Sequence, residues 1–186
     1  MKIELGAKNY LYPVLITLVG ANVKGKPNYI TIGHVGIVGP SNISVNMGKR
    51  NFTNDGIKEN GTFSVNIPSV QMVKETDYCG LVSGRDVDKA ALFTTFYGKL
   101  KTAPMIEECP ICMECRLVKT IDFPAQDVFI GEVVATYSGE NVLTDDLVDF
   151  SKVQPILGNP HDASYWRLGD RFAMAWSVGK TLESRK

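Results

Sequence analysis

Most of this chain consists of short β-type runs that follow one another at the spacing of hairpins. Such runs alternate apolar and polar residues, or are rich in β-branched and aromatic side chains. They span residues 12–20, 28–35, 42–47, 62–67, 111–123 and 127–138. A regular alternation of strand and long helix is missing, which argues against a doubly wound parallel sheet. The pattern therefore predicts a mainly β fold with short helices, an antiparallel barrel of about seven strands.

Two segments between these runs have helical features. Residues 51–61 begin at Asn51 or Thr53, either of which can cap a helix, and reach Gly61, which can end one. Residues 69–81 follow a proline and carry apolar side chains on a helical spacing. Both are expected to be short helices that decorate the barrel.

Composition and charge narrow the classes of partner. Lys plus Arg and Asp plus Glu each number 20, so the chain has no overall attraction for a polyanion, and nucleic acid is not expected as a partner. The apolar run from Leu11 to Ala21 is shorter than the roughly 20 residues that span a bilayer, so a buried strand and no membrane contact are expected. No export signal is recognised, which predicts a cytoplasmic protein. The length of 186 residues fits a single domain over residues 1–186.

A cationic junction between a strand and a helix is the first candidate site. Lys49, Arg50, Asn51 and Thr53 lie where the run 42–47 meets the helix 51–61. A phosphate there gains free backbone N–H groups, the helix dipole and a charge-assisted contact from Arg50. Taken alone, the segment fits a solvated turn with a capping threonine at least as well, because caps greatly outnumber phosphate sites.

Two further segments carry candidate ligand contacts. Ser83 and Gly84 offer a tight turn, and Lys89 adds a cation at a helix start, where cations are not the preferred charge. The alternative is an exposed charged turn. In residues 28–34 polar side chains and Gly33 interrupt a β-type run, as happens where a ligand approaches the backbone, although an edge strand would look the same.

The cysteines give a weaker signal. Cys109, Cys112 and Cys115 form C-x2-C-x2-C, the first part of an iron–sulfur pattern, but the fourth ligand at a suitable spacing is missing. On a strand, Cys112 and Cys115 would point to opposite faces because their separation is odd. We therefore expect no metal site, and inert or mildly redox-active thiols. A nucleophile elbow, a P-loop and a paired-carboxylate motif are also missing from the sequence, so no catalytic side chain is assigned.

Taken in order, these segments resemble the flavin reductase-like, FMN-binding split-barrel family, close to its flavoredoxin branch. The resemblance covers about residues 10–180, and its specificity comes from the ordered set and not from any one piece. The matching residues are Tyr12-Pro13-Val14, Asn28 to His34, Ser44-Val45-Asn46, Lys49 to Thr53, Phe63 to Ile67, Tyr78-Cys79-Gly80, Ser83 to Lys89, Phe129 to Val133 and Tyr165 to Gly169.

The resemblance implies an antiparallel Greek-key split barrel and a homodimer with FMN near the subunit interface. It implies that residues 28–34 lie along the flavin ring and that residues 50–53 hold the ribityl and phosphate groups. It also implies that Lys89 reaches the flavin end and that Tyr165 or Trp166 covers the cofactor. The cofactor contacts expected on this basis are Asn28, Ile30, Thr31, Ile32, Gly33, His34, Asn46, Lys49, Arg50, Asn51, Thr53, Ser83, Gly84, Lys89, Gln126 and Tyr165.

The activity implied by the resemblance is hydride transfer from NAD(P)H to FMN, with a redox protein or an oxygenase as possible partner. The cofactor carries such chemistry, which agrees with the lack of a catalytic motif. Two positions depart from the family: His34 replaces a frequent tryptophan and Gln126 a frequent histidine. These departures motivate an alternative, an FMN-binding electron carrier without NAD(P)H turnover. The sequence does not choose between NADH and NADPH, between tightly held and transient FMN, or among acceptors.

Overall fold

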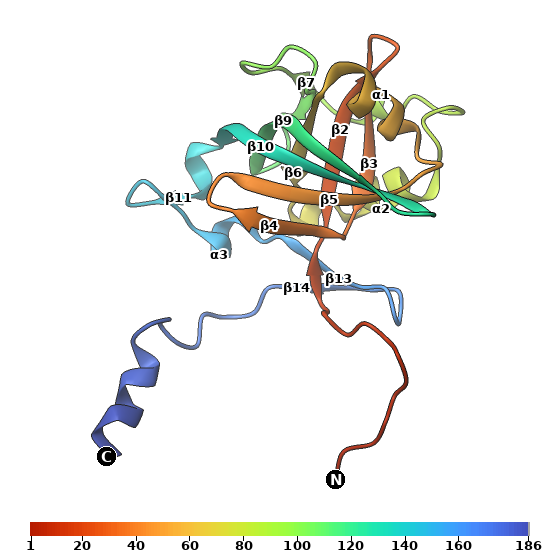
Figure 1. Ribbon diagram of the computed structural model, residues 1–186. Coiled ribbons are helices and arrows are strands. Elements are labelled where there is room, and N and C mark those ends of the chain that lie inside the picture. The colour runs from red at the N-terminus through yellow and green to blue at the C-terminus, as the bar shows by residue number, and fades with distance from the viewer. Residues whose placement is uncertain (186) are drawn as a thin grey trace.

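The computed structural model describes residues 1–185 and has a seven-stranded antiparallel sheet at its centre (Figure 1). The strand order is β3-β2-β6-β9-β10-β5-β4, so the pairs β2–β6, β6–β9 and β10–β5 join segments distant in sequence. The strands of this sheet are β2 (Thr17–Val23), β3 (Lys26–Ile32), β4 (Val35–Gly39), β5 (Asn42–Gly48), β6 (Thr62–Ile67), β9 (Ile111–Asp122) and β10 (Gln126–Ser138).

The sheet curls into a barrel around an apolar core. Along β5 the side chains of Val45 and Met47 are buried, and both belong to the cluster that fills the barrel together with Phe63 and Phe129. The two end strands of this order, β3 and β4, are joined through Gly33 and His34. The backbone N–H of Asn46 on β5 donates to the carbonyl oxygen of His34 at 2.9 Å, which extends the β4–β5 pairing by one residue. Residues 33–34 therefore lie between the two ends of the sheet.

Two helices cover the barrel. Helix α1 (Phe52–Asn60) packs on β2 so closely that a Cβ on Gly56 would lie 2.2 Å from the carbonyl oxygen of Asn22. Helix α2 (Val73–Leu81) follows the 3-10 turn η1 (Val70–Met72) and packs on β3. The other helical turns are η2 (Lys89–Leu92), η3 (Glu140–Val142), α3 (Phe150–Val153) and η4 (Val178–Arg185).

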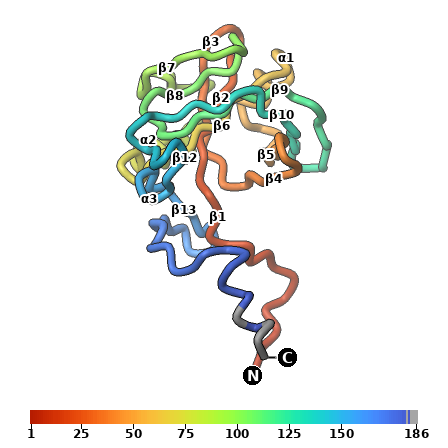
Figure 2. The backbone as a smooth tube through the Cα atoms, turned by 90° about the vertical axis from the view of Figure 1, so that its left-hand side faces the viewer, coloured from red at the N-terminus to blue at the C-terminus, as the bar shows by residue number. Residues whose placement is uncertain are grey.

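A small second sheet and two terminal segments lie below the barrel in Figure 1. The small sheet has the order β1-β13-β14. Both terminal segments leave the molecule beyond this sheet, on the same side of the barrel, which the rotated view in Figure 2 also shows. The remaining strands are β1 (Val14–Leu15), β7 (Thr95–Phe96), β8 (Met105–Ile106), β11 (Leu143–Thr144), β12 (Leu147–Val148), β13 (Ile156–Asn159) and β14 (Ser164–Arg167).

The mainly β architecture and most of the expected elements are confirmed. The run expected at 28–35 divides into two strands, because the chain turns at residues 33–34 to cross from β3 to β4. Asn51 occupies the N-cap position of α1 without a side-chain capping bond, Thr53 lies inside the helix, and Gly61 ends it with φ of 64°. Among residues 1–185, no helix is both long and apolar enough to cross a membrane.

The cysteine run enters β9, as expected: Cys112 and Cys115 lie on the strand, and Cys109 precedes it. Cys115 packs in the barrel core, whereas Cys112 packs in a second cluster under α2, so the two side chains do point to opposite faces of the sheet. Burial raises the pKa of each of these two thiols to about 12. Both sulfur atoms are therefore protonated at neutral pH and poor nucleophiles.

Candidate functional site

A cavity of about 230 Å³ lies between the start of α1 and the end of α2, and we call it the α1–α2 cavity. One wall is the strand-to-helix junction before α1, the other is the loop from α2 to residue 84, and β3 forms the floor. Its lining residues are Ile30, Arg50, Asn51, Phe52, Thr53, Gly80, Leu81, Val82, Ser83, Gly84 and Lys89. Three segments far apart in the sequence, including both segments that carried ambiguous signals on their own, therefore meet in one place.

Lys89 is the buried cation of this cavity. Its side chain is 2% exposed, and its Nζ donates to the carbonyl oxygens of Cys79 at 3.0 Å and Val82 at 3.2 Å, at the C-terminal end of α2. Burial lowers the pKa of Lys89, and the neighbouring Cys79 thiol partly opposes that shift. None of the four ion pairs among the described residues includes Lys89. An ammonium has three N–H donors, so one remains for a ligand in the cavity.

Thr53 offers a hydroxyl in a fixed orientation. Its side chain is 1% exposed and its Oγ1 accepts a hydrogen bond from Nδ2 of Asn28 at 2.7 Å. Because Asn28 occupies an acceptor position on this oxygen, the hydroxyl proton is free to point elsewhere. Asn28 also abuts the opposite wall, since a Cβ on Gly84 would lie 1.9 Å from its Oδ1. Gly84 is thus required for the close approach of the two walls.

The start of α1 completes the polar surface. The first N–H groups of a helix have no partner inside the helix, and Asn51 makes no side-chain cap here. Arg50 is exposed beside them. The two walls are fastened together by Arg85, which donates to the carbonyl oxygen of Arg50 at 3.0 Å and to Asp55 at 2.9 Å, and lies over the ring of Phe52.

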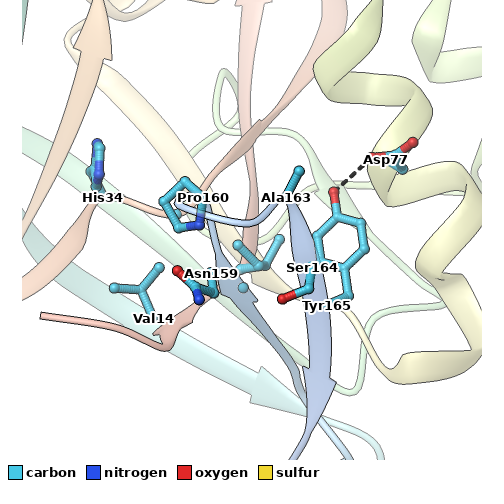
Figure 3. A pocket seen from close by; sticks show the side chains of 11 residues that line it. Val14, His34, Asp77, Asn159, Pro160, Ala163, Ser164 and Tyr165 are labelled. Atoms are coloured by element: carbon cyan, nitrogen blue, oxygen red, sulfur yellow. Dashed lines mark hydrogen bonds between the residues drawn. The ribbon is translucent and has the colours of Figure 1, made fainter. Parts of the chain in front are cut away.

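A second cavity, of about 270 Å³, lies further along β3, and we call it the Tyr165 cavity (Figure 3). It separates α2 from the hairpin of β13 and β14. The hydroxyl of Tyr165 on β14 donates to Oδ1 of Asp77 on α2 at 2.7 Å, across the cavity edge. Burial, together with this hydrogen bond, raises the pKa of Tyr165 to about 12. The lining residues are Val14, Ile16, Gly33, His34, Asp77, Gly158, Asn159, Pro160, Ala163, Ser164 and Tyr165.

The residues expected as cofactor contacts divide between the two cavities. Seven of them line the α1–α2 cavity: Ile30, Arg50, Asn51, Thr53, Ser83, Gly84 and Lys89. Three line the Tyr165 cavity: Gly33, His34 and Tyr165. Asn28 braces the first cavity from behind, by its bond to Thr53. Thr31 lies between the cavities, where its hydroxyl donates to the carbonyl oxygen of Thr76.

Four more of the expected contacts, like Asn28 and Thr31, line neither cavity. The side chain of Ile32 packs in the barrel core, so only its backbone can face a ligand. Lys49 forms an ion pair with Asp122 at the surface. Gln126 is exposed at the start of β10, opposite Gly48. Asn46 has a buried Oδ1 without a hydrogen-bond partner among the described residues.

Sequence reasoning missed several lining residues. The α1–α2 cavity is also lined by Phe52, Leu81 and Val82, which are neighbours in sequence of the predicted polar residues. The Tyr165 cavity is also lined by Asp77, from the middle of α2. The expected helix at 69–81 contained Asp77, but nothing in a single carboxylate on a helix separates a site residue from a solvated one. The hairpin of β13 and β14 could not be paired with α2 before its position in space was known.

Comparison with known proteins assigns the family. The model of the flavin reductase like domain matches residues 9–157, and the chain belongs to this family. A protein of Archaeoglobus fulgidus is 32% identical over 136 residues, which cover 70% of this chain and 76% of that protein.

Two solved structures of flavoredoxins resemble the chain over nearly its whole length. The flavoredoxin of Methanosarcina acetivorans is 48% identical, with a TM-score of 0.95 and coverage of 98% of this chain and 99% of that one. The flavoredoxin of Desulfovibrio vulgaris (Miyazaki F) is 34% identical, with a TM-score of 0.90 and coverage of 96% and 100%. The fold is therefore the split barrel of flavin reductase-like proteins, as the sequence predicted.

Proposed function

We propose that the chain binds FMN with its phosphate in the α1–α2 cavity, and that NAD(P)H reduces this FMN by hydride transfer. The observation that carries the proposal is the donor set of the cavity. A buried ammonium at Lys89, an oriented hydroxyl at Thr53 and an uncapped helix start all face one space. Hydrogen-bond donors that face a cavity suit an anionic ligand, because each can donate to a phosphate or flavin oxygen. The flavoredoxin relatives support FMN as that ligand.

The residues around the cavity have distinct roles in this proposal. Arg50, Thr53 and the start of α1 hold the phosphate, with Asn51 and Ser83 beside them. Lys89 faces the flavin end and stabilises negative charge there. The backbone of residues 30–34 lines the ring, which runs along β3 toward His34. FMN, when bound, supplies the hydride and electron chemistry, so the protein itself binds, orients and shields.

Two departures from the family pattern favour a second candidate function. Where this family often has tryptophan and histidine, the chain has His34 and Gln126; His34 lies in the Tyr165 cavity, and Gln126 is exposed and away from both cavities. An altered ring environment favours an FMN electron carrier without NAD(P)H turnover, which would exchange electrons with a redox protein or an oxygenase component. We place NAD(P)H oxidation first because the family model is that of flavin reductases.

We also propose a homodimer in the cytoplasm as the working form. The terminal segments support this assembly, because they leave the barrel with large apolar side chains exposed. Phe172 is 99% exposed and Trp176 is 95% exposed. Exposed apolar surface of this kind marks sites where proteins contact one another. In the proposed homodimer both side chains contact the second copy and are removed from water.

Two experiments test the proposal. The first compares FMN with riboflavin in binding titrations of the wild-type chain and of Arg50→Ala. Loss of a charge-assisted bond to the phosphate should weaken FMN by about 1.5–3 kcal/mol and leave riboflavin nearly unchanged. Equal weakening of both ligands would mean that the phosphate lies elsewhere.

The second experiment follows NADH and NADPH oxidation by the FMN-loaded protein at steady state. Turnover well above that of free FMN supports the reductase. Tight FMN binding with no turnover above that level would overturn the reductase and leave the electron carrier. The matched control is the same amount of FMN without protein.

A further inference from the structure

Three contacts bridge the two walls of the α1–α2 cavity at the end where α1 begins. All three are made by the side chain of Arg85. Its Nη1 donates to the carbonyl oxygen of Arg50 at 3.0 Å, its Nη2 donates to Oδ2 of Asp55 at 2.9 Å, and its guanidinium carbon lies 4.8 Å from the centre of the Phe52 ring. We call Arg85, Asp55 and Phe52 the Arg85 bridge. Arg50 and Phe52 also line the cavity, so the bridge supports its wall directly.

The loop that carries Arg85 is packed closely against its surroundings. A Cβ on Gly84 would lie 3.0 Å from Cδ1 of Phe52 and 1.9 Å from Oδ1 of Asn28. The backbone N–H of Arg85 donates to Oγ of Ser83 at 3.1 Å, which leaves the hydroxyl proton of Ser83 free to point into the cavity. An isolated exposed ion pair would hold little. Arg85 instead holds three partners at once with a planar, preorganised group.

The Arg85 bridge lies at the end of the cavity that receives the phosphate in the proposed function. The free N–H groups at the start of α1, the hydroxyl of Thr53 and the side chain of Arg50 belong to this end. Lys89 belongs to the other end, beside the last carbonyl oxygens of α2. A phosphate monoester presents its terminal oxygens to such donors and needs no space beyond them. A phosphate that carries a second ester must continue past the donors, between walls that the bridge holds together.

We propose that the Arg85 bridge makes the site selective for FMN and against FAD, in which an adenylate is attached to the same phosphate. This inference rests on the proposed function and specifies which class of flavin the site accepts. Both flavins carry about two negative charges at neutral pH, so long-range attraction to Lys89 and Arg50 does not separate them. They differ in the bulk beyond the phosphate. A barrier against the larger ligand is a general way to gain specificity.

Arg85 is a positioning residue in this inference, because it does not line the cavity. It holds the ring of Phe52 beside Gly84 and fixes the carbonyl group of Arg50, and these residues face the ligand. Asp55 lies one step further away and forms its ion pair with Arg85. Removal of either partner of this ion pair should therefore let the walls part and admit the adenylate, while the donors that line the cavity remain.

The test compares FMN with FAD in calorimetric titrations of the full chain freed of flavin. We expect the wild-type protein to bind FMN at least about tenfold more tightly than FAD. Arg85→Ala and Asp55→Ala should each reduce this preference to about threefold or less, because the barrier is lost. The two flavins carry similar charge, so the ratio of their affinities cancels the change of charge in each variant and measures the barrier.

Two further variants separate the barrier from general damage to the fold. Arg85→Lys keeps the charge but loses the planar fork, so it should restore only part of the preference that Arg85→Ala loses. The matched control is Arg116→Ala. Arg116 is also an exposed arginine, it pairs with Glu132 at 3.1 Å, and it lines neither cavity. Its removal should leave both affinities and their ratio unchanged, whereas general damage would weaken both flavins alike.

The outcomes distinguish this inference from the function on which it rests. A smaller preference for FMN in the wild-type protein, or a preference that persists in both Arg85→Ala and Asp55→Ala, would overturn the inference and leave FMN binding intact. If Arg85→Ala does not fold, Asp55→Ala decides the question, because Asp55 lies outside the cavity lining. A wild-type protein that binds neither flavin would overturn the proposed function itself.

Discussion

At the scale of single residues, the charge on Lys89 should make FMN binding depend on pH. Burial holds the pKa of Lys89 below its ordinary value of 10.5 in the free protein. An anionic ligand favours the charged ammonium, so the pKa is higher in the complex than in the free protein. The contribution of Lys89 to affinity is therefore fully present below the free-state pKa and is lost as pH rises through it. FMN affinity should therefore fall across the alkaline range, beginning below the ordinary lysine value of 10.5.

Titrations of FMN across that range measure the effect, and Lys89→Met provides the control. The variant should bind FMN about tenfold to a hundredfold more weakly at neutral pH, and the alkaline loss should be much smaller. If the variant shows the same alkaline loss as the wild-type protein, another group titrates, and Lys89 has no contact with the ligand.

Gly84 is a residue where one added carbon should separate the walls of the α1–α2 cavity. The Cβ of Gly84→Ala would lie 1.9 Å from Oδ1 of Asn28, which in turn orients Thr53. We expect a loss of about 1–3 kcal/mol in stability and a larger relative loss of FMN affinity, because the loop and Asn28 must both shift. Thermal unfolding and FMN titration measure the two. Gly169→Ala, which adds a Cβ where nothing lies within 4 Å, should change neither.

At the scale of elements, Asp127 fixes the start of α1 to the barrel. This buried carboxylate on β10 accepts from Nδ2 of Asn54 at 3.2 Å and from Nζ of Lys58 at 2.7 Å. Burial opposes its ionisation, but the hydrogen bonds and the charge of Lys58 outweigh burial and lower its pKa. Its stabilising contribution is thus present above the unfolded-state value of 3.8 and lost as pH falls through the lower folded-state pKa.

Asp127→Asn should destabilise the fold by about 1–2 kcal/mol at neutral pH, at the low end for a charged hydrogen bond because Lys58 stays half exposed. Chemical denaturation measures the loss, which should shrink as pH falls below 3.8. The matched control is Asp122→Asn, which removes an exposed ion pair with Lys49 and should change stability little. A similar loss in both variants would contradict the special role of Asp127.

The sequence predicted elements better than it predicted their mutual positions. Period-two alternation located β5 and β6, and Gly61 ended α1 where expected, because these signals are local. The α1–α2 cavity could be foreseen only through the ordered resemblance, since each polar segment alone also fits a capped or charged turn. The Tyr165–Asp77 contact joins residues 88 positions apart and carries no local signal. This pair depends on where the hairpin of β13 and β14 docks against α2, and no single segment of the sequence encodes that position.

At the scale of the whole molecule, the terminal segments should determine the oligomeric state. They leave the barrel on one side, and Phe172 and Trp176 are almost fully exposed. If these two side chains are buried in a homodimer, each contributes about 1.5–3 kcal/mol to association. The double variant Phe172→Ser, Trp176→Ser should therefore raise the dissociation constant at least a hundredfold. Light scattering after size-exclusion chromatography at micromolar concentration should show a monomer.

The control for this variant must remove an equally exposed apolar side chain elsewhere. Leu147 on β12 is 73% exposed and belongs to a separate hairpin, so Leu147→Ser should leave the assembly unchanged. If the double variant stays dimeric over the same concentrations as the wild-type protein, the terminal segments are not in the interface. Monomers that keep their FMN affinity would place the cofactor within one subunit, whereas a parallel loss of affinity would mean that the second copy completes the site, because binding and assembly are then linked.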